Sequence, residues 1–307
     1  AVAALAVESV GLKIKDKGET QYLVFWGPDE INALVDLCAE NWDSLAAVAP
    51  KTLEEVETKG RKSKKKNLAK GVDEEIKRLA REVLSIPKAA DIALFGRMLA
   101  DLPAKNIDAA CQVAHAVSTH KTEMEVDYFT AVDDLQRIES DEGAGAGMIG
   151  SISFNSATFY RYANINYPQL LSNLKGDAEL TRRSIEAFIR SSLEALPTGK
   201  QNTFAAHNPP SFALVLVREG GVPLSLANAF ERPVRHDLRN GGGYILPSLD
   251  ALDAFWGRTV KAFGIHGAAH YLLLEEQDLP NINASAAAVA GLDELVSQTV
   301  SALSNGR

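Results

Sequence analysis

The sequence is poor in cysteine, in long apolar runs and in net positive charge. Its two cysteines, Cys38 and Cys111, lack any C-x-x-C or metal-ligand spacing, which argues against a disulfide scaffold and favours a reducing compartment, so we expect a cytoplasmic protein. No stretch approaches the roughly 20 apolar residues that a bilayer span needs, so we expect no membrane partner. The first residues, AVAALAVESVG, carry no basic leader and no convincing cleavage site. We interpret them as the start of a fragment and not as a signal peptide.

Charge is unevenly distributed along the chain. The net charge of −8 argues against a domain that coats nucleic acid with basic residues. However, seven of the twelve residues from Lys59 to Lys70 are basic, whereas the segment from Lys121 to Glu142 holds eight acidic residues and two basic ones. Clustered lysines neutralise phosphates, although such a run is equally typical of a solubilising loop. The candidate DNA-phosphate ligands in the basic segment are Lys62, Lys64, Lys65 and Lys66.

Hydrophobic periodicity predicts a mixed α and β chain. Apolar residues at helical spacing predict helices over 31–45, 76–84, 185–196, 249–263 and 292–303. Alternating or continuous apolar runs rich in β-branched and aromatic residues predict strands over 22–26, 151–154, 158–165 and 212–217. This succession indicates an α+β core that carries a helical insertion.

Motifs of catalysis and cofactor binding are weak in this sequence. The Gly-rich stretch GAGAGMIG, residues 143–150, does not lie between a strand and a helix as a dinucleotide fingerprint does, so we expect a hinge and no cofactor. His120, Asp133 and Asp134 could together hold a divalent ion for a nuclease, although adjacent acids more often cap or face solvent. A metal-dependent nuclease is therefore the alternative, and our preferred interpretation has no metal and no catalysis.

Aromatic residues in the predicted strand over 158–165 allow two interpretations. Tyr160 and Tyr162 alternate with Arg161, so the two rings share a face on which bases could stack. Packing in the protein core explains strand aromatics equally well.

Several longer phrases occur in a fixed order and point to a family. They are DIALFGRMLAD (91–101), AHAVSTH (114–120), DYFTAVDDLQ (127–136), FNSATFYRYANIN (154–166), FAAHNPP (204–210) and PLSLANAFERPV (223–234). These phrases resemble the CasC family, the backbone subunits of the type I-E CRISPR Cascade surveillance complex, within the Cas-seven superfamily. The resemblance is strong from about Asp91 to Tyr271 and weaker outside that range.

The resemblance implies an α+β protein shaped like a hand. Its palm would have a modified RNA-recognition (ferredoxin-like) fold with a helical finger insertion and a protruding thumb. On this sequence the mostly helical fingers correspond to residues 1–109 and the palm to residues 110–307, with the thumb inserted at residues 118–150. The family's N-terminal palm strand and basic guide-gripping segment have no counterpart before Ala1.

The same resemblance implies a non-catalytic protein that binds CRISPR RNA. Copies of the chain would form a helical filament along the guide, associate with other Cascade subunits, and present the guide for pairing with target DNA in antiviral defence. The RNA contacts would be Arg97 and Met98 in the phrase GRM, Tyr128, Phe129 and Thr130 in DYFTAVDD, and Arg161. Because the thumb is acidic, we expect its contacts with RNA to be apolar or through backbone N–H groups.

Overall fold

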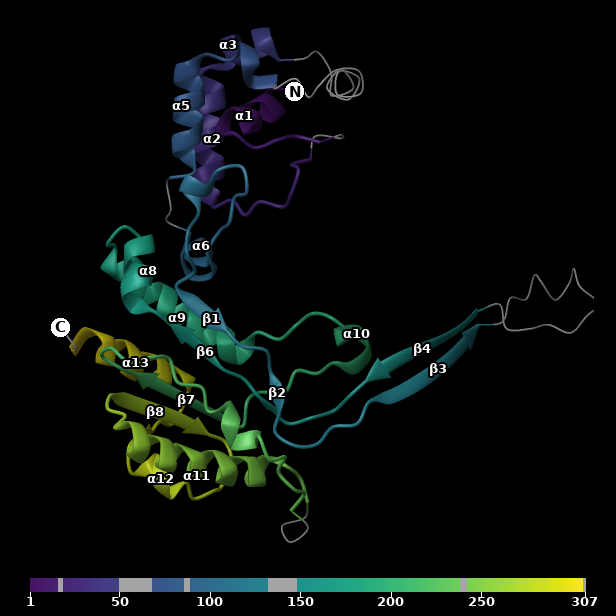
Figure 1. Ribbon diagram of the computed structural model, residues 1–307, viewed down its shortest axis with the longest axis vertical. Helices are drawn as coiled ribbons and strands as arrows, with labels where there is room; N and C mark the ends of the chain where they lie inside the picture. Colours follow the sequence, from purple (N-terminus) through teal and green to yellow (C-terminus); the bar gives the residue numbers. More distant parts are fainter. Residues whose placement is uncertain (16–18, 50–67, 86–88, 132–147, 238–241, 306–307) are drawn as a thin grey trace, which may run out of the picture. The chain divides into compact units, whose positions relative to one another are not determined.

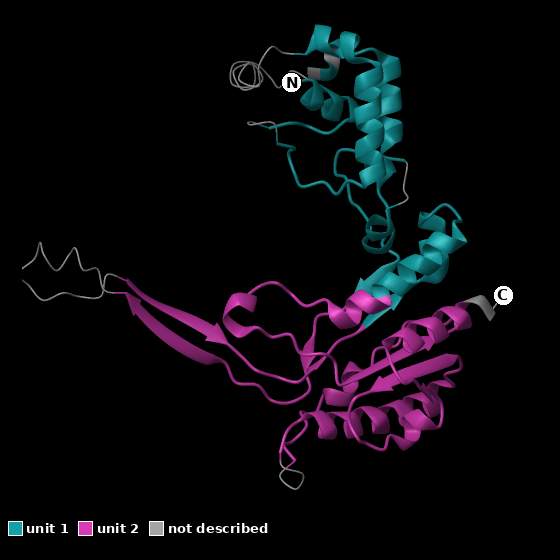
Figure 2. Ribbon diagram, turned by 180° about the vertical axis from the view of Figure 1, so that it is seen from behind, with its two compact units in different colours: residues 1–113, 163–188 teal, residues 114–162, 189–307 magenta. Residues whose placement is uncertain are grey.

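Figure 1 shows the chain as a computed structural model, which describes residues 1–15, 19–49, 68–85, 89–131, 148–237 and 242–305. The chain forms two compact units (Figure 2). Unit 1 comprises Ala1–Val113 and Ala163–Phe188, and unit 2 comprises Ala114–Tyr162 and Ile189–Arg307. Within the described ranges, no helix is long and apolar enough to cross a membrane.

Unit 1 is built mainly from helices. In α5, the Asp73 carboxylate accepts the N–H of Glu75 at 2.7 Å and caps the first turn, and Ile76, Ala80 and Val83 are buried along one stripe. The helix expected over 76–84 is therefore confirmed. The helical elements of the first segment are α1 (Val2–Val10), α2 (Pro28–Glu40), α3 (Trp42–Val48), η2 (Leu68–Gly71), α5 (Glu74–Val83), α6 (Ala90–Phe95) and η3 (Pro103–Lys105).

The helix expected over 31–45 is divided at Asn41. The backbone of Asn41, with φ −112° and ψ 24°, leaves the helical region between α2 and α3. Its side-chain amide donates to the Leu37 carbonyl at 2.9 Å. Asparagine favours such local bonds to the backbone over a continued helix, which explains the break.

The prediction of a strand over residues 22–26 is wrong. The segment pairs with no strand among the residues that the structure describes. Its side chains nevertheless alternate, because Leu23 and Phe25 are exposed whereas the side chains on either side of them pack against the core. The period of two thus reflects the alternating burial of an extended segment.

Two clusters of buried apolar side chains form the core of unit 1. The first contains Val10, Leu12, Leu37, Ala80, Leu84 and Leu99. The second contains Leu5, Leu45, Ala69, Val72 and Ile76. Since α1 and α5 contribute to both clusters, these two helices join them, and each fully buried aliphatic side chain stabilises the fold by about 1.5–3 kcal/mol.

A later chain segment, 163–188, completes unit 1. The strand β1 (Cys111–Val113) pairs antiparallel with β6 (Ala163–Ile165), and α8 (Tyr167–Asn173) and the start of α9 (Ala178–Glu194) follow. The side-chain amide of Asn173 donates to the Ala93 carbonyl in α6 at 2.8 Å. The sequence-based division, which stays a prediction, assigned both strands of this ladder to the palm; in the structure they belong to unit 1.

Unit 2 combines a small sheet with helices. The strand β7 (Phe212–Val217) runs antiparallel to β8 (Ala268–Leu273), which is parallel to β9 (Ala287–Ala288). The long helices α11 (Ile245–Phe263) and α13 (Leu292–Asn305) confirm the helices expected there. The other elements are β2 (Val117–Ser118), β3 (Glu125–Ala131), β4 (Met148–Phe154), β5 (Phe159–Tyr160), α10 (Gln201–Phe204), η4 (Ala227–Phe230) and α12 (Pro280–Asn283).

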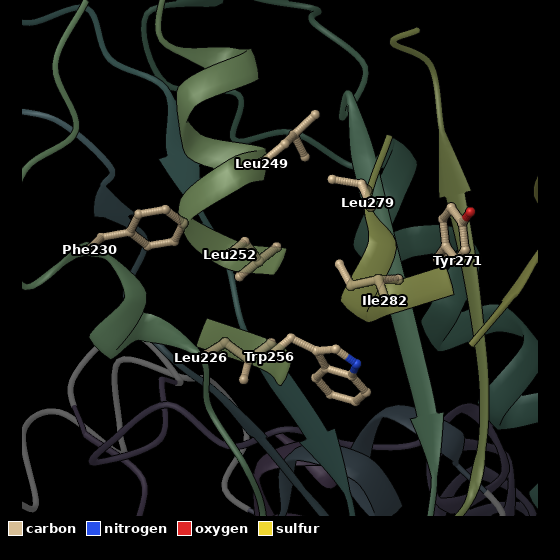
Figure 3. Close-up of a cluster of buried hydrophobic side chains, with 8 residues drawn as sticks. All are labelled: Leu226, Phe230, Leu249, Leu252, Trp256, Tyr271, Leu279 and Ile282. Atoms are coloured by element: carbon tan, nitrogen blue, oxygen red, sulfur yellow. The ribbon is translucent and has the colours of Figure 1, made fainter. Parts of the chain in front are cut away.

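The core of unit 2 lies around one face of α11 (Figure 3). Its buried members are Leu226, Phe230, Leu249, Leu252, Trp256, Tyr271, Leu279 and Ile282. The indole N–H of Trp256 donates to the Ser285 hydroxyl at 2.8 Å, and the buried Asp253 carboxylate accepts the backbone N–H of Ile282 at 2.8 Å. Both bonds tie α11 to the α12 region and leave the buried polar groups satisfied.

Candidate nucleic-acid interface

A tight loop at the end of α6 presents Met98. Gly96 ends the helix with φ +77°, and a Cβ atom there would lie 2.7 Å from the Ile107 carbonyl oxygen. Arg97 and Ile107 exchange two backbone hydrogen bonds of 2.9 Å each, which fixes the close approach. The Met98 side chain, the next along the loop, is 80% exposed. An apolar side chain is thus held at the surface by a rigid backbone.

Arg97 does not have the RNA-contacting position expected from the sequence. Its guanidinium forms an ion pair with Glu30 at 2.7 Å, and both side chains are only 2% exposed. The same guanidinium donates to the carbonyls of Phe25 at 3.2 Å and Leu84 at 3.1 Å. We therefore correct its role: Arg97 is buried and holds three segments of unit 1 around the Met98 loop.

An open pocket of about 490 Å³ adjoins Met98. Its apolar side chains are exposed, including Leu23 and Phe25 from the extended segment and Phe95 from the end of α6. Apolar and aromatic surface of this kind can contact the faces of unstacked bases. Sequence analysis missed Phe25 and Phe95, and the alternation over 22–26 was the available signal for Phe25.

The hairpin of β3 and β4 is exposed along its length. The strands pair antiparallel from Glu125 opposite Phe154 to Ala131 opposite Met148, and every residue of β3 is exposed. Cross-strand partners share a face, and neighbours along a strand point to opposite faces. Consequently Phe129 lies on one face, and Tyr128 and Thr130 lie on the other.

Phe129 is positioned by a glycine on the opposite strand. Gly150 is its cross-strand partner, and a Cβ on Gly150 would lie 2.3 Å from the Phe129 Cζ atom. The aromatic ring therefore covers the glycine, an arrangement that stabilises glycine in strands. The ring remains 41% exposed, and Glu125 and Asp127 occupy the same face. Negative charge beside the ring disfavours phosphate there, so this face offers an apolar contact surface.

The two other sequence-based candidates in unit 2 differ in exposure. Arg161 is exposed, and one of its guanidinium nitrogens donates to the Ser192 carbonyl at 2.8 Å. Tyr160 packs against Phe230, and its hydroxyl accepts the N–H of Leu226 at 2.8 Å. Burial raises the pKa of the Tyr160 hydroxyl. Tyr160 therefore belongs to the core, and the interpretation of this ring as a base-stacking platform is wrong.

His120 does not offer a free nitrogen to a metal. Its Nε2 accepts the backbone N–H of Thr158 at 3.1 Å, and its Nδ1 lies 2.9 Å from the Lys121 carbonyl oxygen. Since Nε2 accepts, Nδ1 carries the hydrogen and donates. Within the described ranges, no group of three or more His, Cys, Asp or Glu side chains is placed to hold a metal ion.

Six of the sequence-based candidates lie outside the described residues. Four belong to the basic segment and two to the suggested nuclease site; they are Lys62, Lys64, Lys65, Lys66, Asp133 and Asp134. The glycines at 143, 145 and 147 lie outside as well.

Comparisons with known structures place this architecture among RNA-guided complexes. A chain of a structure described as "CRISPR RNA-guided surveillance complex" is 35% identical, with a TM-score of 0.60 over 70% of this chain and 78% of that chain. A chain of a second, described as "CRISPR RNA-guided surveillance complex, pre-nicking", is 29% identical, with a TM-score of 0.67 over 98% of this chain and 78% of that chain. No curated protein matches this chain in sequence.

A family match covers nearly the whole chain. The family described as CT1975-like protein matches residues 1–298. Together with the two structures, this match confirms the resemblance to the Cas-seven backbone subunits of Cascade that the phrases from 91 to 234 indicated. The chain belongs to the CT1975-like protein family.

Proposed function

We propose that this chain is the CRISPR-RNA-binding backbone subunit of a type I-E surveillance complex. Copies stack along the guide RNA, and the guide pairs with target DNA. The observation that carries the proposal is the hairpin of β3 and β4, in which every residue of β3 is exposed and only Gly150, Ile152 and Phe154 of β4 are partly buried. A two-stranded hairpin with so little packed surface is at best marginally stable alone, so we expect it to bind a partner. Similarity to chains of RNA-guided complexes supports RNA as that partner.

The hairpin has the chemistry of a wedge between nucleotides. Phe129 on one face and Thr130 on the other let a single inserted strand contact the nucleotide on each side. Unstacking a base step costs a few kcal/mol, and stacking on an aromatic ring recovers about 1–3 kcal/mol per base. Met98, on its rigid loop, supplies a second apolar contact. None of these groups distinguishes one base from another, which suits a scaffold that must accept any guide.

On this proposal the elements of the chain correspond to the parts named in the family. The helices α1 to α5 correspond to the fingers, the sheet of β7, β8 and β9 with α11 and α13 to an RNA-recognition-like palm, and the hairpin to the thumb. Positive charge for phosphate comes from Arg161 and from the basic segment, in which Lys62, Lys64, Lys65 and Lys66 would contact target DNA. Other Cascade subunits would bind the ends of the stacked copies.

Binding of the full chain to labelled RNA of increasing length tests the proposal. We expect the number of bound copies, measured by native mass spectrometry, to rise in steps as the RNA lengthens. Affinity should fall with salt because phosphates are neutralised. Length-independent binding, or no binding, would refute the stacked-copy role. Cleavage of the RNA when magnesium is added would instead favour the nuclease that uses Asp133 and Asp134.

Two matched pairs of variants test the contacts. Phe129→Ala should weaken RNA binding about fivefold to 100-fold, the loss expected for one stacked base, whereas Phe263→Ala, at an exposed phenylalanine at the end of α11, should not. Likewise Met98→Ala should weaken binding and Leu274→Ala should not. All four side chains are exposed, so the thermal midpoint should change little. Equal effects within either pair would remove that contact from the proposal.

A further inference from the structure

The strand ladder that leads into the hairpin is interrupted at its base. β2 pairs with β5, and the N–H of Thr119 extends this ladder by donating to the Thr158 carbonyl at 2.9 Å. The hairpin ladder begins only at Glu125 opposite Phe154. In this part of the described chain, no backbone hydrogen bond joins residues 121–124 to residues 155–157. The hairpin is therefore joined to the rest of unit 2 by two segments without backbone pairing to each other, and the Phe154 ring at its base packs on Phe204 with ring centroids 5.6 Å apart.

A side chain supplies the last hydrogen bond before this gap. The backbone N–H of Thr158 donates to His120 Nε2 at 3.1 Å, whereas the Thr119 carbonyl, its partner in a regular ladder, accepts the N–H of Val234 at 3.0 Å. The other ring nitrogen, Nδ1, donates to the Lys121 carbonyl, the first residue of the gap. His120 thus contacts both segments of the backbone that lead into the hairpin.

The imidazole ring is itself fixed from the other side. It stacks on Tyr244 with ring centroids 3.7 Å apart and planes at 13°, and His236 meets Tyr244 edge-on at 5.4 Å. Tyr244 directly precedes α11, and Ser248 in α11 donates to the Thr119 hydroxyl at 2.8 Å. Since Leu249, Leu252 and Trp256 of α11 belong to the core of unit 2, His120 connects the base of the hairpin to a helix of that core.

We propose that His120 is a positioning residue for RNA binding. Its Nε2 acceptor and its stacked ring fix where the rigid part of the chain ends and the hairpin begins. This sets the direction in which Phe129 and Thr130 are presented and keeps the spacing of displaced nucleotides uniform along the guide. The inference rests on the proposed function. It goes beyond it by assigning the orientation of the hairpin to a residue that touches no RNA.

Two substitutions at His120 separate its acceptor from its ring. His120→Phe keeps an aromatic ring against Tyr244 but leaves the Thr158 N–H without an acceptor, whereas His120→Gln keeps an acceptor near the position of Nε2 and removes the ring. Tyr244→Phe, which keeps the stack, is the matched control. Each full-length variant is compared with the parent chain by thermal melting, by amide exchange over residues 121–131 and 148–157 without RNA, and by nuclease protection on a single-stranded RNA.

We expect His120→Phe to speed amide exchange at the hairpin base, to weaken RNA affinity about tenfold, the effect of one unmade hydrogen bond, and to blur the regular protection pattern. His120→Gln should restore much of the affinity, and Tyr244→Phe should behave as the parent chain. The inference is overturned if His120→Phe leaves exchange and protection unchanged. It is also overturned if both His120 variants lose RNA binding only in proportion to a lower melting temperature, because that result would mean that His120 only stabilises the fold. If the parent chain itself binds no RNA, the proposed function is refuted. This result is obtained before any His120 variant is measured, so the two failures can be distinguished.

Discussion

Replacing Arg97 by methionine is expected to destabilise unit 1 because the guanidinium is buried and paired. The substitution leaves the Glu30 carboxylate, 2% exposed, without its cation, and removes the donors to the Phe25 and Leu84 carbonyls. Removing one partner of a buried ion pair costs about 3–5 kcal/mol. This is a large part of the roughly 5–15 kcal/mol by which a typical domain is stable. We therefore expect Arg97→Met to lower the free energy of unfolding by about 3–5 kcal/mol.

A second substitution at Glu30 makes this prediction specific to the pair. Glu30→Met alone leaves the cation buried and should be about as destabilising as Arg97→Met. The double variant removes both charges, and buried pairs replaced by apolar residues of similar size are often neutral in stability. We expect the double variant to be more stable than either single variant, which requires a coupling energy between the two residues larger than the cost of one single substitution, about 3–5 kcal/mol.

Urea unfolding followed by tryptophan fluorescence measures these changes. Trp26 and Trp42 belong to unit 1 and Trp256 belongs to unit 2. In a Trp256→Phe background the fluorescence therefore reports the unfolding of unit 1 alone. Arg78→Met is the control, because Arg78 pairs with Glu75 and Glu82 on an exposed surface and should matter little. The reasoning is refuted if Arg97→Met changes the unfolding free energy by less than about 1 kcal/mol while RNA affinity falls. That result would make the guanidinium an RNA ligand.

Two further predictions concern the hairpin and the thiols. Gly150→Ala should push the Phe129 ring off the opposite strand and weaken RNA binding, with the unfolding free energy changed by less than about 1 kcal/mol. Ser153→Ala, opposite Val126 near the base of the hairpin, should bind as the parent chain. Fluorescence anisotropy with labelled RNA checks both. Burial raises the pKa of Cys38 and Cys111, so less reactive thiolate is present at a given pH and the profile of iodoacetamide alkylation should be displaced to higher pH than for free cysteine. Mass spectrometry of the native chain measures it, and alkylation of either thiol at the rate of free cysteine would contradict it.

Sequence periodicity was sufficient where an element buries one continuous stripe. The helices α5, α11 and α13 were predicted because their apolar residues recur at helical spacing and pack on a core. The segment over 158–165 was predicted as one strand but is β5 and β6, which pair with different strands. Pairing between distant strands leaves no mark on local periodicity, so the break was not predictable.

In the candidate site, too, features set by neighbouring residues could be predicted from the sequence, and contacts between distant residues could not. The exposure of Met98 and the hairpin residues agrees with their expected contact with RNA, although contact itself stays a prediction. Arg97 was expected to contact RNA because the resemblance covers the phrase GRM, which contains both Arg97 and Met98. Its partner Glu30 lies 67 residues earlier, and only the fold brings the two charges together. The opposite orientation of Phe129 and Thr130, in contrast, follows from strand alternation once the hairpin is known.

The acidic residues of the hairpin also bear on self-association of the free protein. Two strands with free edges and exposed apolar side chains are a template for edge-to-edge aggregation. Glu125 and Asp127 place negative charge along β3, so two unliganded hairpins repel each other when they approach as strands. The carboxylates that make the arm a poor phosphate ligand thus act as gatekeepers, and they discourage uncontrolled self-association of the free protein.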